Sequence, residues 1–405
     1  MLLLAGCGRP AAVPAAPVAD APSPPSLAAP ADVPPPSPPV TVGTGIAPEL
    51  GDAVATPADQ WPLSRGNAQA TGVSLAVLPE ALDLLWTFKS DKGGFEATAV
   101  IRDGVVYAGT SDGEFCAVDL ATGKKKWGFP VEAGFIAAAA VGDDLVFAGD
   151  NDGRLHALDR ASGKRKWYFD ADGRIHGGAN FYRDKVLFGS EDGNLYCLEA
   201  KTGKLAWKFE SPSQVRCQPA IIGDRAFVAG CDGLLHVVDL ASGAEASHAS
   251  LGGVTGCTPA LLGGMAFVGT EGQEFLGIDW KQSQTVWSFH DEQHGESFRS
   301  SAAATPDLVV VGSLNRHVYA LDPKTGRQLW VRALRGEVQS SPVLVGQRIF
   351  VGSAGGQVYA LEKKNGAVAW EFKAGGHVHA GPAVAAGRLV IGNSTGTLFC
   401  FGKKN

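Results

Sequence analysis

The stretch Val105-Val106-Tyr107-Ala108-Gly109, followed by Ser111-Asp112-Gly113, Val118-Asp119, Thr122-Gly123 and Trp127, decides the fold because it recurs along the chain. The equivalents of Val105 are Leu145, Lys185, Arg225, Met265, Leu308, Arg348 and Arg388. The spacing between them is 40 residues, apart from one interval of 43. A period of about 40 residues, with short strands separated by turn signals, is typical of β-propeller blades. The sequence therefore predicts an all-β, eight-bladed β-propeller of four-stranded antiparallel blades.

Turn residues stand at fixed places in each repeat. Asp-Gly pairs at 112, 152, 192 and 232 favour the positive φ angles of a tight hairpin between the second and third strands. An acidic residue such as Asp119 precedes the next turn in seven repeats, and we interpret these carboxylates as acceptors for backbone N–H groups of the turn. The repeat thus accounts for them without a catalytic role.

The last repeat ends at Phe401 without a fourth strand, whereas Leu84–Phe88 has the pattern of a fourth strand and precedes the first repeat. We predict that this N-terminal strand completes the last blade and closes the ring. Closure removes the exposed strand edge that an open ring would leave.

Large aromatic side chains recur at one register near the outer edge of the blades. We predict that they are structural keys that pack between blades; they are Trp86, Trp127, Trp167, Trp207, Trp287, Trp330 and Trp370. Blade 4 has Ser247 at this register, and blade 5 has Ser283 at the turn glycine and a new Trp280. Either this sector has drifted, or weaker packing there makes room for a partner.

The N-terminus reads as an export signal followed by a tether. Leu4-Ala5-Gly6-Cys7 resembles a bacterial lipobox, which implies a lipidated Cys7 and an outer-membrane lipoprotein facing the periplasm. Residues 8–60 hold most of the prolines and few charges, so we predict a Pro/Ala-rich disordered tether. The domains are then a signal remnant at 1–7, the tether at 8–60 and the propeller at 61–405.

The repeat phrase Phe350-Val351-Gly352-Ser353, Val358-Tyr359-Ala360-Leu361 and Trp370 resembles that of pyrroloquinoline-quinone-like (PQQ-like) propellers. This group includes quinoprotein alcohol dehydrogenases and the BamB-like lipoproteins of the bacterial envelope. The enzyme branch implies a vicinal cysteine pair and a calcium set, yet no Cys-Cys and no matching acidic motif occur here. The resemblance therefore favours the BamB-like branch, in which the ring serves protein contacts.

One ring of variable residues should lie at the mouth of the central channel, just before each innermost strand. These residues are Glu96, Ile136, His176, Arg216, Gly256, Arg299, Gln339 and His379. We predict that the polar members, which are Glu96, His176, Arg216, Arg299, Gln339 and His379, form a ligand rim. The alternative is a set of solvated polar ends that line a water-filled funnel.

Cys217 and Cys257 occupy equivalent positions on adjacent blades. In an oxidising periplasm they could form a disulfide if their Cα atoms come within about 7 Å. The alternative is that both are small residues selected for fit beside the axis.

Composition and motifs narrow the function. The net charge of −6 offers no basic stripe for nucleic acid, and no nucleophile elbow, phosphate loop or zinc-helix motif occurs. We therefore expect no enzyme activity, no metal site and no cofactor, and a non-enzymatic envelope scaffold that binds protein partners through one propeller face. The alternatives are a quinoprotein that binds PQQ with calcium and a propeller that binds another small ligand.

Overall fold

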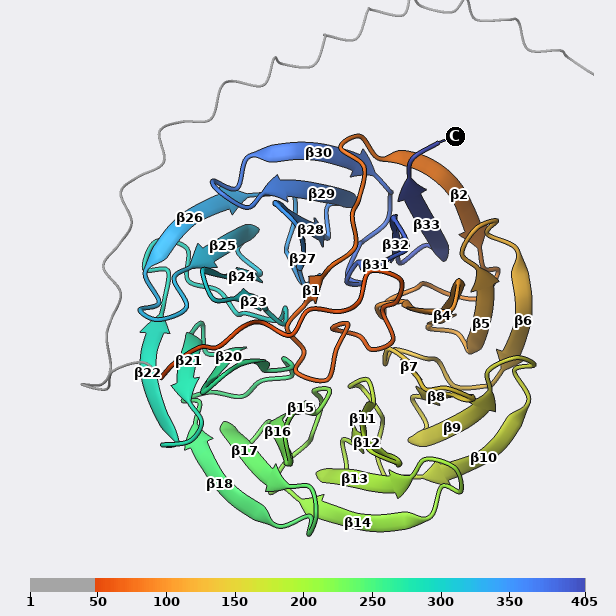
Figure 1. Ribbon diagram of the computed structural model, residues 1–405, viewed down its shortest axis with the longest axis horizontal. Helices are drawn as coiled ribbons and strands as arrows, with labels where there is room; N and C mark the ends of the chain where they lie inside the picture. Colours follow the sequence, from red (N-terminus) through yellow and green to blue (C-terminus); the bar gives the residue numbers. More distant parts are fainter. Residues whose placement is uncertain (1–47, 405) are drawn as a thin grey trace, which may run out of the picture. The chain divides into compact units, whose positions relative to one another are not determined.

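The computed structural model describes residues 48–404, and these residues form eight blades arranged around a central axis (Figure 1). We number the blades 1 to 8 in chain order, so that blade 1 begins at Val100 and blade 8 at Ala383. All regular structure in this range is β-strand. Within these residues there is accordingly no helix with the length and apolar character needed to cross a membrane.

Each blade is built on four strands that lie side by side, from an innermost strand at the axis to an outer strand at the edge of the ring. The innermost strands are β3 (Val100–Arg102), β7 (Ala140–Val141), β11 (Asn180–Tyr182), β15 (Ala220–Ile222), β19 (Ala260–Leu262), β23 (Ala303–Thr305), β27 (Val343–Val345) and β31 (Ala383–Ala385). The second strands are β4 (Val105–Gly109), β8 (Leu145–Gly149), β12 (Lys185–Gly189), β16 (Arg225–Ala229), β20 (Met265–Gly269), β24 (Leu308–Gly312), β28 (Arg348–Gly352) and β32 (Arg388–Gly392). The third strands are β5 (Glu114–Asp119), β9 (Arg154–Asp159), β13 (Asn194–Glu199), β17 (Leu234–Asp239), β21 (Phe275–Asp279), β25 (His317–Leu321), β29 (Gln357–Glu362) and β33 (Thr397–Gly402). The outer strands are β6 (Lys125–Pro130), β10 (Arg165–Asp170), β14 (Leu205–Glu210), β18 (Glu245–Ser250), β22 (Gln284–Phe289), β26 (Gln328–Ala333), β30 (Val368–Lys373) and, in blade 8, β2 (Asp83–Lys89).

The ring closes as the repeat predicts. Strand β2 pairs antiparallel with β33, with Leu84 opposite Phe401 and Phe88 opposite Leu398, so the N-terminal strand completes blade 8. Figure 1 shows this orange strand outside the dark blue C-terminal strand. The eight-bladed all-β prediction and its N-terminal closure are confirmed.

One strand was not predicted. Strand β1 (Val73–Ser74) pairs parallel with β27, which gives blade 7 a fifth strand beside the axis. It belongs to an N-terminal segment that crosses the middle of the ring (Figure 1).

The turns form where the repeat places its glycines and carboxylates. Gly113 has a φ of +90°, and a Cβ atom there would lie 2.3 Å from the Val131 carbonyl oxygen, so only glycine fits without strain. At the following turn, Asp119 Oδ1 accepts a hydrogen bond of 2.9 Å from the Thr122 backbone N–H. The five aspartates of this register, which are Asp119, Asp159, Asp239, Asp279 and Asp322, all accept a backbone N–H of their turn in this way.

The predicted tryptophan keys join neighbouring blades. Six indole N–H groups donate to a carbonyl oxygen in the next blade at 2.9–3.2 Å, from Trp86, Trp127, Trp167, Trp207, Trp287 and Trp330. Each of these rings lies under a turn glycine of that blade; the glycines are Gly123, Gly163, Gly203, Gly243, Gly326 and Gly366. Trp370 instead packs edge-on against Phe401 of blade 8, with ring centroids 5.1 Å apart.

The contact between blades 4 and 5 lacks both partners of this pair, since Ser247 and Ser283 stand at the two registers. Ser283 keeps the left-handed backbone, with a φ of +55°. Trp280 of blade 5 packs edge-on against Phe227 of blade 4 at 5.1 Å, and its indole donates to the Gly263 carbonyl at 3.0 Å. An aromatic ring from the other side of the contact thus occupies this sector.

The propeller begins earlier in the sequence than expected. Residues 48–60 were assigned to the tether, yet Leu50 is buried against blades 5 and 6. Thr56 donates its backbone N–H to the Val73 carbonyl and is fully buried. Residues 48–60 are therefore part of the folded propeller. The rest of the predicted tether, residues 8–47, and the predicted lipidation site at Cys7 lie outside the described residues.

Candidate functional site

The two faces of the disc differ because each strand type runs in one direction. One face carries the turns between the second and third strands and the loops that precede each innermost strand. The Phe135 N–H donates to the Thr110 carbonyl and so joins the turn of blade 1 to the loop that leads into blade 2. We call it the open face. The other face carries the remaining turns, joined in blade 1 by the Leu120 N–H to Gly104 carbonyl bond. We call it the plug face.

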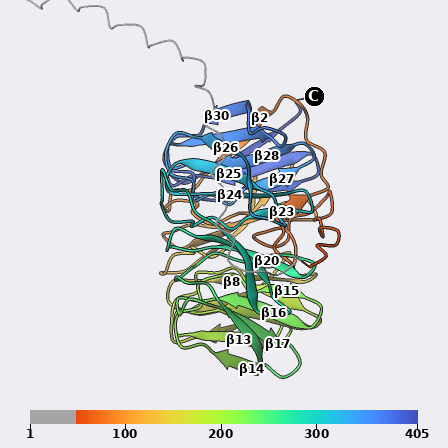
Figure 2. The ribbon, with the colours of Figure 1, turned by 90° about the vertical axis from the view of Figure 1, so that its left-hand side faces the viewer.

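An N-terminal segment, Thr56–Ser74, closes the axis at the plug face, and we call it the axial plug. Its backbone hydrogen-bonds to the inner strands of six blades, through Ile101, Val141, Ile221, Leu261, Ala304 and Leu344, and to Ala386 directly after the inner strand of blade 8. Blade 3 is reached by Asn180, whose Nδ2 donates to the Ala68 carbonyl at 2.9 Å. Figure 2 shows this red segment at one side of the disc.

Arg65 fastens the axial plug to the ring. Its Nη2 donates to the carbonyl oxygens of Ala302 at 2.9 Å and Pro342 at 2.7 Å, in blades 6 and 7. The side chain is 2% exposed, and its Nε and Nη1 have no partner within residues 48–404. Burial lowers the pKa of this guanidinium to about 9.

Above the axial plug lies a cavity of about 250 Å³ on the axis, which we call the axial cup. The plug contributes Ser64 to it. Seven of the eight predicted rim positions line it, which are Glu96, Ile136, His176, Arg216, Gly256, Arg299 and His379. Gln339 lines the two adjoining cavities instead. The structure thus brings the predicted rim together around one concave site.

Charges at the rim are paired with carboxylates. Arg216 Nε donates to Glu191 Oε1 at 3.0 Å, and Arg299 Nε lies 3.3 Å from Glu271 Oε1. His379 Nδ1 lies 3.1 Å from Glu96 Oε2 across the junction of blades 8 and 1.

His176 is a half-buried imidazole of the rim, with an inaccessible Nε2 atom. Burial lowers its pKa, against the opposing effect of the carboxylate of Glu191. Its Nε2 is 3.7 Å from that carboxylate, beyond hydrogen-bond distance, and has no hydrogen-bond partner within residues 48–404.

A second polar layer lies two residues after the rim, and the sequence analysis missed it. Its polar members are Thr98, Gln218, Thr258, Ser301 and Ser341. Each hydroxyl accepts a backbone N–H from a neighbouring blade at 2.9–3.1 Å. Gln218 lines the cup but is only 1% exposed, and its buried Nε2 has no hydrogen-bond partner among the described residues. A serine or threonine at this register in four of the eight repeats, and a glutamine in a fifth, was the signal that could have found this layer.

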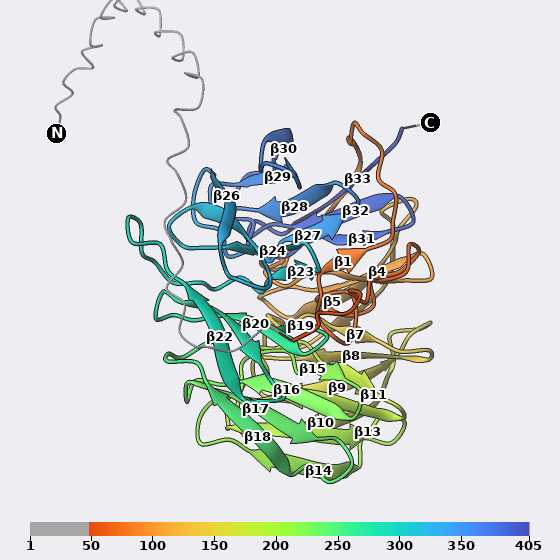
Figure 3. The same cartoon turned by 60° about the vertical axis from the view of Figure 1, so that its left-hand side comes forward.

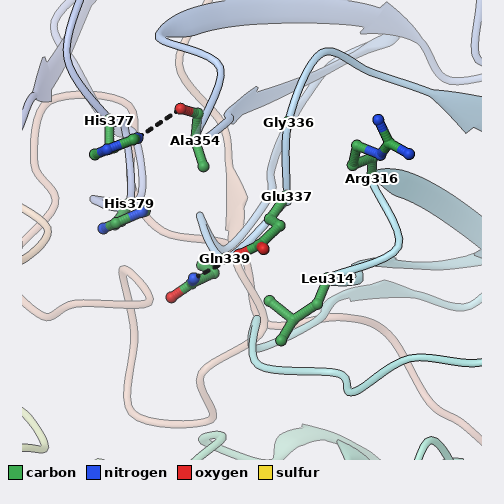
Figure 4. A pocket seen from close by; sticks show the side chains of 8 residues that line it. All are labelled: Leu314, Arg316, Gly336, Glu337, Gln339, Ala354, His377 and His379. Atoms are coloured by element: carbon green, nitrogen blue, oxygen red, sulfur yellow. Dashed lines mark hydrogen bonds between the residues drawn. The ribbon is translucent and has the colours of Figure 1, made fainter.

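Two larger hollows adjoin the axial cup on the open face. One, of about 560 Å³, is lined by Arg316, Glu337, Gln339, His377 and His379 among others (Figure 4). In it the rings of His377 and His379 stack with centroids 5.5 Å apart. The other, of about 490 Å³, shares Arg216 and Arg299 with the cup. The open face is therefore concave around its centre.

The possible disulfide between Cys217 and Cys257 is absent from the structure, in which both residues are free thiols. Cys217 Sγ accepts the Ala229 backbone N–H at 3.3 Å, and Cys257 Sγ donates to the Phe298 carbonyl at 3.3 Å. Each sulfur thus has a partner in its own surroundings, and burial raises the pKa of Cys217 to about 12 and of Cys257 to about 11. Both residues act as small buried groups, which was the alternative interpretation.

The axial cup does not fit a planar quinone held with calcium. Its only carboxylate is Glu96, and within residues 48–404 no group of three or more acidic, histidine or cysteine side chains converges on one point. Ca²⁺ requires six to eight oxygen ligands. The lining also has no Trp, Tyr or Phe ring against which a flat ring system could stack.

Several solved structures share this fold. BamB from Moraxella catarrhalis superposes with a TM-score of 0.67 at 20% identity, covering 80% of this chain and 98% of that one. A quinohemoprotein alcohol dehydrogenase from Comamonas testosteroni gives 0.69 at 15% identity, over 85% and 81%. A europium-containing methanol dehydrogenase gives 0.73 at 13% identity, over 85% and 98%. At these identities the likeness establishes the fold alone.

Comparison of the sequence with protein families separates these relatives, which the fold alone does not. No curated protein matches the chain. The family described as outer membrane protein assembly factor BamB matches residues 76–216, 170–246, 192–336 and 294–405, which together span every blade. With its eight closed blades, the chain belongs to the BamB family of outer membrane protein assembly factors.

Proposed function

We propose that this protein is a non-enzymatic scaffold of the bacterial envelope that takes part in outer-membrane protein assembly by binding protein partners through its open face. Membership of the BamB family supports the envelope location and the assembly role. The open face supports the mode of action, because its loops and hollows offer a concave surface of partly exposed side chains.

The asymmetry of the two faces is the observation that carries this proposal. The axial plug covers the centre of the plug face, and Glu49 reaches the same face beside Gly264. Figure 3 shows the red N-terminal segment and the C-terminus toward one side of the disc. A lipid anchor at Cys7 would thus join the propeller from the plug face and leave the open face free for a partner.

The competing function is that of a PQQ-binding quinoprotein, because two dehydrogenases of that kind have the same propeller fold as this chain. The lining of the axial cup argues against this function, because it offers one carboxylate for calcium and no aromatic ring on which PQQ could stack. Titration of the purified protein with PQQ and calcium separates the two proposals. We expect no change in quinone absorbance and no thermal shift; saturable changes in both would favour the quinoprotein function.

Site-specific photo-crosslinking in intact envelopes tests the scaffold role. A photoreactive residue at Val254, which is 42% exposed on the open face, should give a discrete adduct with an envelope protein. The matched control is Val77, which is 84% exposed beside Gly387 at the plug face. Adducts from Val77 alone, or from neither site, would overturn the assignment of the open face.

A further inference from the structure

We propose that the axial cup is a binding site for a carboxylate group. The inference does not rest on the scaffold role, because it follows from the hydrogen-bonding capacity of the cup itself. The cup contains many donors that no acceptor in the described chain satisfies, and a carboxylate is a compact group that only accepts.

The floor of the cup supplies neutral donors. Thr98, Thr258 and Ser341 each accept a backbone N–H through the side-chain oxygen. A hydroxyl has one O–H in addition to its lone pairs, so each retains a proton to donate. None of these protons has an acceptor in residues 48–404, and all three side chains line the cup.

Gln218 adds an independent observation. Ser64 of the axial plug donates to its Oε1, which fixes the amide and orients Nε2 as a donor. That Nε2 is buried and has no hydrogen-bond partner in the described chain, and Gln218 is one of the residues that line the cup. A buried unpaired donor is costly in a native protein, and a ligand acceptor would satisfy it.

The rim supplies charged donors. Arg216 and Arg299 each use Nε for a glutamate, which leaves Nη1 and Nη2 of both guanidiniums without a partner in residues 48–404. The glutamates they pair with do not line the cup, whereas Glu96 does and is paired with His379. Because Glu191 and Glu271 balance the two guanidiniums, Arg216 and Arg299 bring free N–H donors, rather than net positive charge, to the cup.

These features select the chemistry of the ligand. A metal cation would find a single carboxylate, that of Glu96, which is already paired with His379, and a flat aromatic ligand would find no stacking surface. A volume of about 250 Å³ accommodates a small dicarboxylate or the carboxylate end of a peptide. Charge-assisted hydrogen bonds from arginine to such a group are the strong ones in proteins.

Calorimetric titration of the detergent-solubilised full-length protein with succinate tests the site, with chloride at equal ionic strength as the reference. Tri-alanine with a free C-terminus tests whether the carboxylate at a chain end binds as well. Tri-alanine with an amidated C-terminus tests whether that carboxylate is required. We expect succinate or the free-ended peptide to bind, and the amidated peptide to bind at least about tenfold more weakly. Absence of binding by both succinate and the free-ended peptide, or binding of the amidated peptide as tightly as the free-ended one, would overturn the proposal.

Variants localise the binding to the cup. Arg216→Gln should raise the dissociation constant about tenfold, which is the effect of losing one charged hydrogen-bond donor. Arg154→Gln is the matched control, because Arg154 is equally exposed, at 40% against 39%, and also pairs with a carboxylate. Unchanged thermal unfolding shows that each variant is folded. Equal affinity of the Arg216→Gln and Arg154→Gln variants would place any binding elsewhere and refute the site.

Discussion

Replacement of Gly326 by alanine tests how the blades are held together. Gly326 has a φ of +69°, and a Cβ atom there would lie 2.5 Å from Cε3 of the fully buried Trp287. The left-handed backbone costs an alanine about 1–2 kcal/mol. Crowding a packed aromatic adds about 1–3 kcal/mol. We therefore expect Gly326→Ala to lower the free energy of unfolding by about 2–5 kcal/mol.

Gly346 is the matched control, because its φ is +59° and a Cβ atom there would meet nothing within 4 Å. Gly346→Ala should cost only the backbone term of about 1–2 kcal/mol. Urea denaturation followed by tryptophan fluorescence and circular dichroism compares the two midpoints, provided that the m-values are equal. Equal losses for the two variants would refute the view that Trp287 seals against Gly326 in the next blade.

Three further predictions address separate parts of the chain. Leu50→Ala should lower the free energy of unfolding by about 2 kcal/mol and expose the segment before the axial plug to protease, because Leu50 is only 4% exposed. Val54→Ala is the control: Val54 is 45% exposed, so the free energy of unfolding should change by no more than about 0.5 kcal/mol. At pH 8 a thiol reagent should modify Cys231 first and leave Cys257 unmodified until unfolding, since burial raises the Cys257 pKa to about 11; rapid native modification of Cys257 would contradict this. Burial acts to raise the pKa of Asp150, but hydrogen bonds from a neighbouring imidazole and two backbone N–H groups outweigh it and hold the pKa below its usual range. Its stabilising effect is thus present above about pH 4 and lost as the pH falls through the lowered value, so the stability gap between wild type and Asp150→Asn should narrow in acid urea titrations; a constant gap would contradict it.

The repeat accounts for most of the fold because each blade obeys the same local rules. Turn residues such as Gly113, the closing strand at Leu84–Phe88 and the tryptophan register all follow from the period. The axial plug could not be predicted, because Thr56–Ser74 has no period of its own. It binds through backbone hydrogen bonds to the inner strands, and such contacts leave little trace in side-chain identity.

The candidate site was predicted in part for a similar reason. Register places Arg216 and His379 at the axis, since equivalent positions of eight blades must converge there. Register does not give the ion pairs, because Glu191 and Glu271 lie in turns that approach the rim only once the blades are packed. The plug residue Ser64 could not be placed either, and with it the orientation of Gln218 was beyond reach.

The irregular contact between blades 4 and 5 illustrates how packing decides between two interpretations that the sequence left open. If the sector had been vacated for a partner, the loss of tryptophan at Ser247 would leave Phe227 without an aromatic neighbour. Instead Trp280 contacts Phe227 and is itself tied to the Gly263 carbonyl. Phe227 is fully buried, so the sector is filled from the other blade. The turn glycine became dispensable at Ser283 for the same reason, because no indole ring lies beneath it. The two departures from the repeat are therefore one compensated exchange, and the argument for a partner moves from this sector to the open face.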